Sequence, residues 1–420
     1  MAEQKILRTS RSYDITLKIK GESYTNDITN VRISSSLSTG YQIVTITIKI
    51  TPQTILLNKL YGQDSIDLVI NKLDASEFIT ETMKFDLMVV TSEFEVPVSD
   101  LITTGKQMDR SSFDLITVNR IPFQIMTSLV GVIFGPLCPS PWTAPITIKN
   151  MIESIVNNKV DPKPILELDT DNINTEPISQ CCIPPTTLMK AIHYLDHNYG
   201  IFNGAPAIFC DNDNKLKIMN LSAKIKKNYS IYVEHLTTQH SEKDITKASE
   251  DKKYFYTYDN LFTNYIGNAK FGTLGKKLKH IVLPSNTLSH TIEQDLTEVC
   301  KKYGVIGQTK GEASYINTTV AKRTRYYIEN NGQDKTEVHA NSKIAKQIAD
   351  LSRMSFMIER NLAIEELIKI GEVVKVGTKT QEHLDISGKY ILFSSDLIWN
   401  KQSEWQTTAR LELIRTNKTV

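Results

Sequence analysis

Cysteine is scarce in this sequence, and its spacing is irregular. The chain has 420 residues and only 5 cysteines, Cys138, Cys181, Cys182, Cys210 and Cys300, with no Cys-x-x-Cys pair among them. An odd number of irregularly spaced cysteines does not build a disulfide framework. The pattern predicts free thiols in a reducing compartment.

Long apolar runs and a charge excess are also missing. Residues 1–12 contain charged and polar residues and no apolar h-region, which predicts no signal peptide. The most apolar stretch, 121–137, contains Gln124, Thr127 and Ser128, so it predicts a buried helix or strand pair and not a membrane span. Lys and Arg number 49 against 47 Asp and Glu, for a net charge of +2, which gives no long-range attraction to nucleic acid or anionic membrane. We expect a soluble protein, made in the cytosol, with no membrane partner.

Fingerprints of nucleotide binding and serine hydrolysis are absent as well. The sequence contains no G-x-x-x-x-G-K-[ST], G-x-G-x-x-G or G-x-S-x-G motif. No pair of carboxylates stands out as a glycosidase site. Lysine runs at 215–227 and 276–279 have few aromatic residues between them for stacking bases, which favours a solvated face. We predict a protein that is not an enzyme, with no catalytic residues, no cofactor and no metal.

Two neighbouring segments nevertheless carry reactive side chains. Cys181 and Cys182 lie just before a predicted helix, whose N-terminus would stabilise a thiolate, although buried packing is the ordinary role of such cysteines. His193 and His197 lie four residues apart on that helix and would both reach one metal. A zinc site needs more ligands, and a peptidase helix places Glu after the first His, where this chain has Tyr194. Half-exposed helix histidines are the simpler interpretation.

A third candidate site is acidic. Asp211-Asn-Asp213-Asn resembles the start of a calcium loop, which needs Gly at its sixth position and an acid at its twelfth. Those positions hold Leu216 and Ser222. The segment is therefore interpreted as a hairpin turn between two strands.

Alternating apolar and polar residues dominate the N-terminal quarter. Residues 41–50 read Tyr-Gln-Ile-Val-Thr-Ile-Thr-Ile-Lys-Ile, the period-2 pattern of a half-buried strand, and Pro52 ends it. The same pattern predicts strands at 13–20, 28–33, 65–71 and 84–92, with a short helix or loop at 53–61. So many strands in so short a stretch indicate a small barrel or sandwich.

Helical patterns follow after about residue 104. The 3.6-residue period predicts helices at 121–133, 148–157 and 186–199. Thr186 or Thr187 would cap the last of these helices, and Gly200 would close it. Residues 161–185 hold several prolines and acids with little periodicity, which predicts a crossing loop.

Strands return in the second half of the chain. They are predicted at 205–210, 215–221, 355–363, 372–376, 390–399 and 405–415, with one helix at 342–353. A faint internal echo links the two ends, because residues 35–42 and 394–406 each run from a serine pair to a glutamine beside an alternating strand. A duplication would leave such an echo.

Three segments carry a family resemblance. They are Ile33–Ile50 with Leu60–Gln63, then Ile183–Gly204, then Gly388–Arg415, and together they span about a quarter of the chain. These segments resemble the baseplate hub, or tube-initiator, proteins of contractile phage tails. In that family the third pattern is the closing pair of strands of the tube-forming domain. Residues 240–350 match nothing in the pattern.

The resemblance implies a mainly β fold with α+β insertions, built on two barrel-like antiparallel β modules. The implied domains are 1–104 for the first tube-like module, 105–204 for an α-containing insertion, 205–245 with 345–420 for the second tube-like module, and 246–344 for a second insertion. Three such chains would form a homotrimeric ring of near-sixfold symmetry.

The implied function is structural. The ring would join the hexameric tail tube protein to the trimeric central spike protein and line the channel for DNA, which it would contact only transiently. Baseplate wedge proteins and the tape measure protein would be further partners. The protein would belong to the virion, in the tail baseplate, and be assembled in the host cytoplasm. The residues expected at the oligomer or tube interface are Tyr41, Ile43, Thr45, Thr47, Trp399, Trp405, Thr407 and Arg410. Core packing within one module is an equally good interpretation of either tryptophan.

Two other functions stay open. One is a tail-associated cell-wall hydrolase, for which Cys181 or Cys182 with His193 or His197 would be the machinery. The other is a carbohydrate- or receptor-binding β protein. An aromatic content of 8% without a visible cluster argues against the latter.

Overall fold

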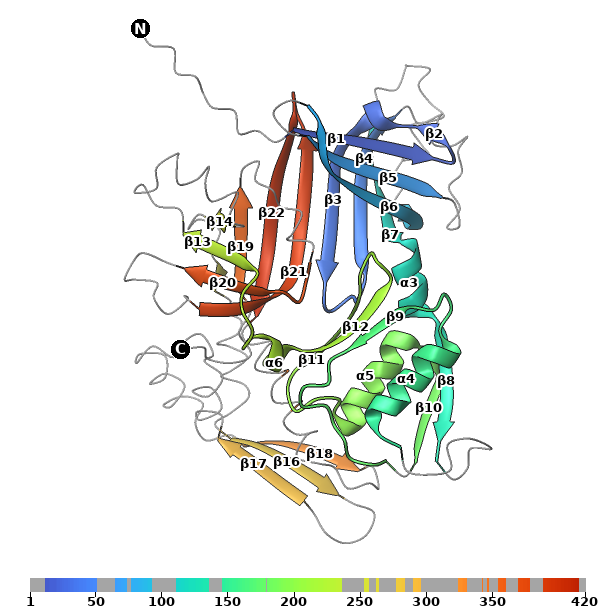
Figure 1. The fold of residues 1–420 in the computed structure, drawn as a ribbon, viewed down its shortest axis with the longest axis vertical. Coiled ribbons are helices and arrows are strands. Elements are labelled where there is room, and N and C mark those ends of the chain that lie inside the picture. Colours follow the sequence, from blue (N-terminus) through green and yellow to red (C-terminus); the bar gives the residue numbers. More distant parts are fainter. Residues whose placement is uncertain are drawn as a thin grey trace, which may run out of the picture.

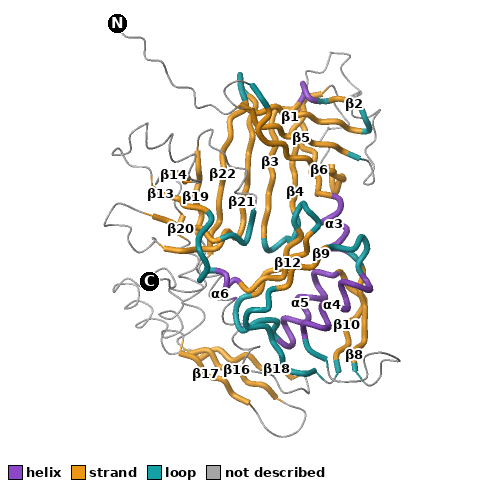
Figure 2. Tube along the Cα trace, viewed as in Figure 1, coloured by secondary structure: helices purple, strands orange, loops and turns teal. Residues whose placement is uncertain are grey.

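The computed structural model describes residues 12–50, 65–73, 77–92, 111–135, 146–178, 180–235, 253–256, 262–263, 277–283, 290–295, 324–330, 342, 346, 354–359, 369–377 and 388–414. Its architecture is mainly β with inserted helices, which confirms the predicted fold class. Figure 1 shows a tall sheet above a lobe that contains the helices, and Figure 2 shows how strands dominate the whole.

One large sheet contains both ends of the described chain. Its N-terminal strands are β1 (Ser12–Ile19), β2 (Glu22–Ser23), β3 (Ile28–Ser36), β4 (Gln42–Ile50), β5 (Ile66–Leu73), β6 (Ile79–Ser92) and β7 (Ser111–Asn119), with a short 3-10 turn, η1 (Thr25–Asp27). The order of pairing is β3–β4–β7–β6–β5–β1–β2. In β4, Val44, Ile46 and Ile48 are buried while Thr45 and Thr47 are half-buried, as the period-2 pattern predicted.

The C-terminal strands extend the same sheet. They are β13 (Ile231–His235), β14 (Lys253–Tyr256), β15 (Phe262–Thr263), β19 (Met354–Glu359), β20 (Val373–Gly377), β21 (Gly388–Lys401) and β22 (Trp405–Ile414). β21 pairs with β20, β3 and β22, and β22 pairs in turn with β19. The strands predicted at 372–376, 390–399 and 405–415 are thereby confirmed.

The two halves of the sheet join through a direct strand pair. β21 runs antiparallel to β3, from Ser394 opposite Ser36 to Asn400 opposite Asn30. The serine pairs of the internal echo therefore face one another across this junction. The hairpins β3–β4 and β21–β22 stand side by side in one sheet (Figure 1).

A lobe of helices and short strands is inserted between β7 and β13. It consists of α3 (Arg120–Thr127), β8 (Leu129–Phe134), α4 (Ile148–Lys159), β9 (Ile165–Leu168), β10 (Cys181–Thr187), α5 (Leu188–Tyr199), β11 (Pro206–Cys210), β12 (Lys215–Asn220) and α6 (Leu221–Lys224). Thr187 accepts a hydrogen bond from Lys190 N at the start of α5, and Gly200 ends that helix with a φ of 74°. The predicted cap residues of this helix are confirmed.

The helix predicted at 121–133 was wrong in its second half. The helix ends at Thr127, because Ser128 has an extended backbone, and the chain continues as strand β8. An apolar run of this length fits a helix or a strand, and periodicity alone does not separate them.

The crossing loop predicted at 161–185 was also wrong, since it contains β9 and most of β10. The sequence did not predict β10 because Pro184 and Pro185 lie within it, and prolines usually indicate that a segment is not a strand. Its register with β8 shifts between Ile183 and Thr186, so Pro184 and Pro185 lie in the strand at an irregularity where no ladder N–H is needed.

A separate sheet lies in the region 246–344. β16 (Lys277–Leu283) pairs antiparallel with β17 (His290–Asp295) and parallel with β18 (Thr324–Asn330). Of the helix predicted at 342–353, the described residues are Ser342 and Lys346, both helical. The segment predicted at 53–61 lies outside the described residues, and the domain boundaries stay a prediction. No helix in the described part of the chain is long and apolar enough to cross a membrane.

Apolar side chains gather in two clusters. The first packs against the large sheet and draws mainly on Tyr13–Val89 and Ile370–Ile414. The second fills the lobe and draws on Ile125–Ile218. The β11–β12 hairpin separates them, because Phe209 belongs to the first cluster and its neighbour Ile208 to the second.

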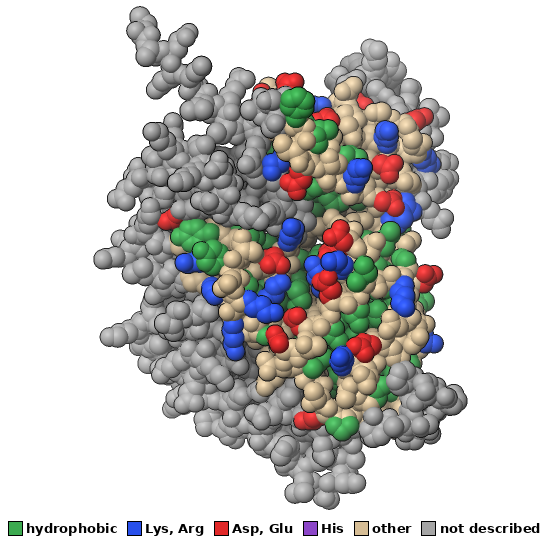
Figure 3. All heavy atoms as spheres, in the orientation of Figure 1, with side chains coloured by type: hydrophobic (Ala, Val, Ile, Leu, Met, Phe, Trp, Pro, Cys, Tyr) green, Lys and Arg blue, Asp and Glu red, His purple; other side chains and the backbone are tan. Residues whose placement is uncertain are grey.

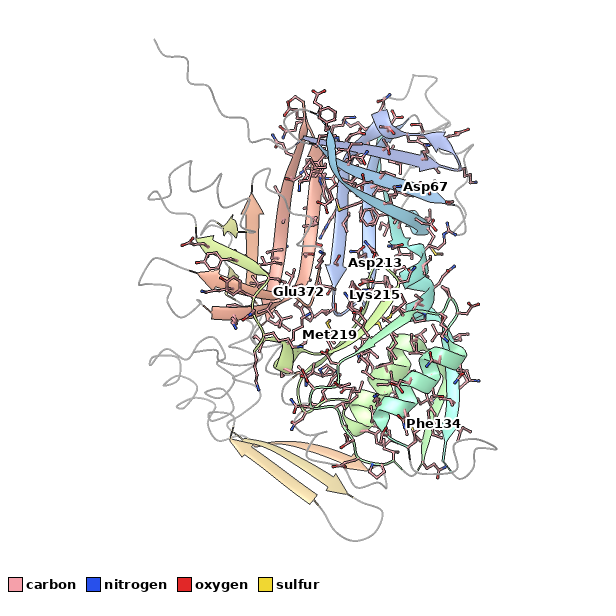
Figure 4. The ribbon with its side chains drawn as sticks, viewed as in Figure 1. Asp67, Phe134, Asp213, Lys215, Met219 and Glu372 are labelled. Atoms are coloured by element: carbon pink, nitrogen blue, oxygen red, sulfur yellow. The ribbon has the colours of Figure 1, made fainter. Side chains whose placement is uncertain are left out.

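Two glycines mark the contact between lobe and large sheet. Gly40, in the β3–β4 turn, has a φ of +76°, and a Cβ there would lie 2.6 Å from Met126 Cε. Gly371 has a φ of +81°, and its Cβ would lie 2.6 Å from the Cε of Met219, which Figure 4 labels just below the large sheet. Glycine alone adopts this backbone freely while leaving room for the neighbour.

Candidate assembly surface

The strands where the two halves meet present two unlike faces. On β3, β4, β21 and β22 every second side chain points into the first apolar cluster. The side chains between them form the opposite face. We name this the polar face; it consists of Asn30, Arg32, Ser34, Ile43, Thr45, Thr47, Lys49, Ser394, Asp396, Ile398, Asn400, Thr408, Arg410 and Glu412, with Asp114 of β7.

Cross-strand contacts tie the polar face together. Arg32 of β3 pairs with Asp396 of β21, with Nη2 and Oδ2 2.8 Å apart. Thr47 Oγ1 of β4 donates to Asp114 Oδ1 of β7 at 2.6 Å. Pairs on an exposed sheet surface contribute only about 0.2–1 kcal/mol each. These contacts fix the positions of side chains on the polar face but contribute little to the free energy of unfolding.

The polar face carries balanced charge. Its cations are Arg32, Lys49 and Arg410, and its carboxylates are Asp114, Asp396 and Glu412. Because each positive group is matched by a negative one within a few strands, the face has no net field that would hold a polyanion.

Five of the eight residues predicted at an interface lie on or beside the polar face. Ile43, Thr45 and Thr47 are half-buried and Arg410 is exposed. Tyr41, just before β4, packs edge-on against Phe123 of α3, with ring centroids 5.2 Å apart, so it lies where sheet and lobe meet. Their role at an interface stays a prediction.

The other three residues point to the buried side of the sheet. Trp399 is fully buried and meets Tyr13 edge-on, with ring centroids 6.1 Å apart. Trp405 is 9% exposed and Thr407 is 1% exposed. Both tryptophans belong to the first apolar cluster, which matches the alternative that each packs within one chain.

A row of buried polar side chains crosses the same junction and was not predicted. Gln42, Ser35 and Ser395 lie opposite one another on β4, β3 and β21, and each is 1% exposed. Gln42 Nε2 donates to Ser35 Oγ at 3.0 Å, whereas Gln42 Oε1 and Ser395 Oγ have no partner in the described part of the chain. Buried polar groups are usually paired. The serine echo was the one sequence signal of this row.

The cysteines that the structure describes in the lobe differ in their exposure to solvent. Cys181 is buried and Cys182 exposed, because successive strand residues point to opposite sides. Burial raises the pKa of Cys181, while a hydrogen bond with Tyr199 lowers it to a smaller extent. Burial also raises the pKa of Cys210 to about 12. A nucleophilic cysteine needs its thiolate, so Cys181 and Cys210 are poor nucleophiles.

The two histidines of α5 have unlike surroundings. His193 is half-buried, and burial followed by the nearby Lys346 lowers its pKa, with Asp196 opposing them. His197 is exposed. Asp196 accepts hydrogen bonds from Ser342 Oγ at 3.0 Å and Lys346 Nζ at 2.9 Å, so it ties these two residues to the lobe. No group of three possible metal ligands from His, Cys, Asp and Glu gathers among the described residues.

The acidic segment is a hairpin turn, as predicted. It joins β11 to β12, which pair antiparallel. Asp211 Oδ1 accepts from the backbone N–H groups of Asp213 and Lys215, both at 3.0 Å, and Oδ2 lies 2.8 Å from Lys217 Nζ. Both carboxylate oxygens of Asp211 are thus engaged within the turn.

Comparison with known proteins bears on the fold. No family model and no curated protein matches the sequence. Among solved structures, the tail protein from Neisseria meningitidis MC58 is similar, with a TM-score of 0.54 and 11% identity over 96% of both chains. The 43 kDa tail protein of prophage MuSo2 from Shewanella oneidensis is similar with a TM-score of 0.54 and 12% identity, over 96% of this chain and 98% of that chain. This chain therefore shares its mainly β fold, with helical insertions, with these two tail proteins.

Proposed function

We propose that this chain is a structural phage tail protein and, more specifically, the baseplate hub of a contractile tail. In this proposal three copies form a near-sixfold ring that joins the hexameric tail tube to the trimeric central spike. The observation that carries it is the direct pairing of β3 with β21, which sets two hairpins side by side in one sheet. Six similar positions in a ring of three chains require two such units in each chain.

The extent of the shared fold supports the proposal. The similarity to the two tail proteins covers 96% of this chain and at least as much of each of theirs, so it is not confined to one common module.

The polar face is proposed as the wall of the channel. DNA carries dense negative charge and binds surfaces that offer unpaired cations, so a wall with matched charges would let it pass. Ile43, Thr45, Thr47 and Arg410 would lie on this wall and meet the tail tube where the wall ends. Trp399 would support the wall from its buried side. Baseplate wedge proteins and the tape measure protein are proposed as further partners on the basis of the family resemblance alone.

The proposal is tested by the mass and shape of the purified full-length chain, alone and mixed with candidate spike and tube proteins. We expect a particle of three times 47.6 kDa, with threefold symmetry and an open centre in electron micrographs. A monomer in every mixture would overturn the proposal.

Two matched variants test the channel wall. Thr45→Arg adds a bulky cation to the polar face, and Thr408→Arg adds one on β22. If this face lines an open channel, both variants keep the ring mass and gain affinity for DNA. Loss of the ring, with an unchanged circular dichroism spectrum, would make the polar face a subunit contact instead.

The hydrolase alternative has less support, because burial raises the pKa of Cys181. Its test is peptidoglycan turnover by the purified protein, compared with Cys181→Ala and Cys182→Ala. Turnover that disappears in either variant would favour the hydrolase.

A further inference from the structure

The buried face of the large sheet is interrupted by one row of polar side chains. Gln42 of β4, Ser35 of β3 and Ser395 of β21 lie opposite one another on three adjacent strands, and each is 1% exposed. The next buried pair along β3 and β21, Ile33 and Leu397, is apolar. On the outer surface in Figure 3, Lys, Arg, Asp and Glu side chains lie among one another in contact with solvent. The buried row has to find its hydrogen-bonding partners inside the molecule.

Hydrogen bonds within the row leave two polar groups over. Gln42 Nε2 donates to Ser35 Oγ at 3.0 Å, whereas Gln42 Oε1 and Ser395 Oγ have no partner in the described part of the chain. Turning the Gln42 amide over would pair Oε1 with the Ser35 hydroxyl but would leave Nε2 without a partner instead. In both orientations one amide atom of Gln42 and the hydroxyl of Ser395 are unsatisfied, which native proteins usually avoid.

A nearby buried hydroxyl shows the ordinary arrangement. Thr117 of β7 is fully buried, and its Oγ1 donates to the backbone carbonyl of Val44 at 2.8 Å. The strand next to it thus supplies the partner that a buried hydroxyl needs. Ser395 has no such bond among the described residues, so its hydroxyl calls for a partner other than the neighbouring strand.

The local geometry suits a small polar ligand between the strands. Ser35 and Ser395 are directly paired, and the Cβ atoms of such a pair lie about 4.5–5.5 Å apart. A water molecule that bonds to two oxygens at about 2.8 Å each joins atoms up to about 5.6 Å apart. Two serines also fill less of a close-packed interior than the apolar pair beside them. In addition, β21 shifts register against β22 between Leu392 and Ser394, and such an irregularity bends a strand locally.

We propose that Gln42, Ser35 and Ser395 bind one buried water molecule, which joins the two halves of the large sheet. The water donates one hydrogen to Gln42 Oε1 and the other to Ser395 Oγ. It accepts a hydrogen bond from the hydroxyl of Ser35, whose own hydrogen is not used in the bond from Gln42. Three hydrogen bonds are the usual number for a buried water. This site lies within one chain, so the proposal is independent of the proposed ring.

The bound water would also favour the observed register between the halves. A shift of β21 by one residue against β3 would carry Ser395 to the opposite face of the sheet. The water would then lose one of its three partners, and Gln42 and Ser35 would be left facing an apolar side chain. The site therefore links the pairing of two strands that are far apart in the sequence to a single hydrated position.

The experiment is a high-resolution crystal structure of the full-length chain and of two serine variants. We expect density for one water within hydrogen-bonding distance of Gln42 Oε1 and Ser395 Oγ, and we expect it to be lost or displaced in Ser395→Ala. The matched control is Ser394→Ala. Ser394 is the next residue of β21, and its Oγ donates to Glu412 Oε2 at 2.9 Å on the polar face, so this variant should keep the water.

Melting temperatures in solution give a second test that needs no crystals. If a water bridges the row, Ser395→Ala removes a hydrogen bond and should lower the melting temperature by on the order of 2 °C. If the site is dry, the same change removes an unpaired buried hydroxyl, and the melting temperature should stay the same or rise. An unchanged or raised melting temperature would therefore overturn the proposal. So would wild-type density in which Ser395 Oγ bonds directly to the protein with no water beside Gln42.

Discussion

The apolar cluster under the large sheet and the cluster inside the lobe differ in how far apart their residues lie along the chain. The lobe cluster comes from one continuous stretch, Ile125–Ile218. The sheet cluster needs both chain ends, because β21 and β22 complete a sheet that begins at β1. Closing a long loop costs conformational entropy before the stabilising contacts between its ends have formed. We expect the lobe to form on its own part of the chain and the large sheet to close later.

The β11–β12 hairpin couples these two regions. All five residues of β11 are buried, since one side of the hairpin faces the sheet cluster and the other faces the lobe cluster. Since β11 has no solvent-facing row, its sequence, Pro-Ala-Ile-Phe-Cys, shows no alternation, whereas β12 begins with alternating residues because Lys215 and Lys217 are only half-buried. The sheet cluster and the lobe cluster are therefore in contact through β11 and β12.

The largest effect is expected from Trp399→Ala. Trp399 is fully buried on β21, so its truncation should lower the free energy of unfolding by about 3–5 kcal/mol, measured by urea denaturation. Amide hydrogen exchange should accelerate in β3 and β21 and stay slow in α5. Ile398→Ala, one residue away on the polar face, is the control and should cost less than about 1 kcal/mol. Equal acceleration in both regions would mean that they unfold as one unit.

A pair of neighbouring substitutions sharpens the comparison. Phe209→Ala removes a side chain from the sheet cluster and Ile208→Ala removes one from the lobe cluster. Each should cost about 2–4 kcal/mol, but hydrogen exchange should reveal opposite patterns, with the sheet loosened by the first and the lobe by the second. Identical exchange patterns would contradict the division into two clusters.

The contact between lobe and sheet is tested at Gly40. Gly40→Ala combines a backbone of φ +76° with a clash against Met126. Gly21→Ala has the same kind of backbone, φ +86°, with nothing within 4 Å of the added Cβ. The backbone alone costs about 1–2 kcal/mol, so Gly40→Ala should lower the melting temperature more than Gly21→Ala does. Equal shifts in melting temperature would show that Met126 moves aside from the added methyl group at no measurable cost in stability.

The smallest effect is expected from pH. The pKa of His193 is lowered in the folded state, first by burial and then by Lys346. The unfolded chain then binds a proton more readily than the folded chain, so the stabilisation is full above about pH 6.5 and is lost as pH falls through the lower folded pKa. His193→Gln should flatten the pH dependence of the melting temperature of the lobe.

Much of the secondary structure was predictable because local rules apply strongly here. The strands β4, β21 and β22 alternate clearly, and α5 has a threonine before it and a glycine after it. Prediction failed at β8 and β10, where an apolar run and two prolines gave misleading signals. In both places tertiary pairing decided between conformations that the local sequence left open.

The candidate surface was only partly predictable. Alternation placed Ile43, Thr45 and Thr47 on one face of β4, as the sequence pattern required. It could not reveal that Trp399 lies on the buried side of the neighbouring hairpin, because the sequence does not say which face of a strand is covered. Nor could it reveal that Lys375 meets Tyr229, since they lie on segments that only the sheet brings together.

The sequence by itself determined that this chain is mainly β, that alternating strands lie in both its N-terminal quarter and its C-terminal part, and that its overall charge is nearly balanced. Those properties follow from residue period, turn residues and composition, all of which act locally. Only the tertiary structure decided that β3 pairs with β21, that one hairpin separates two cores and that Arg32 meets Asp396 across two strands. Strand pairing and charge matching depend on which distant segments become neighbours, and that is settled by the packing of the whole chain.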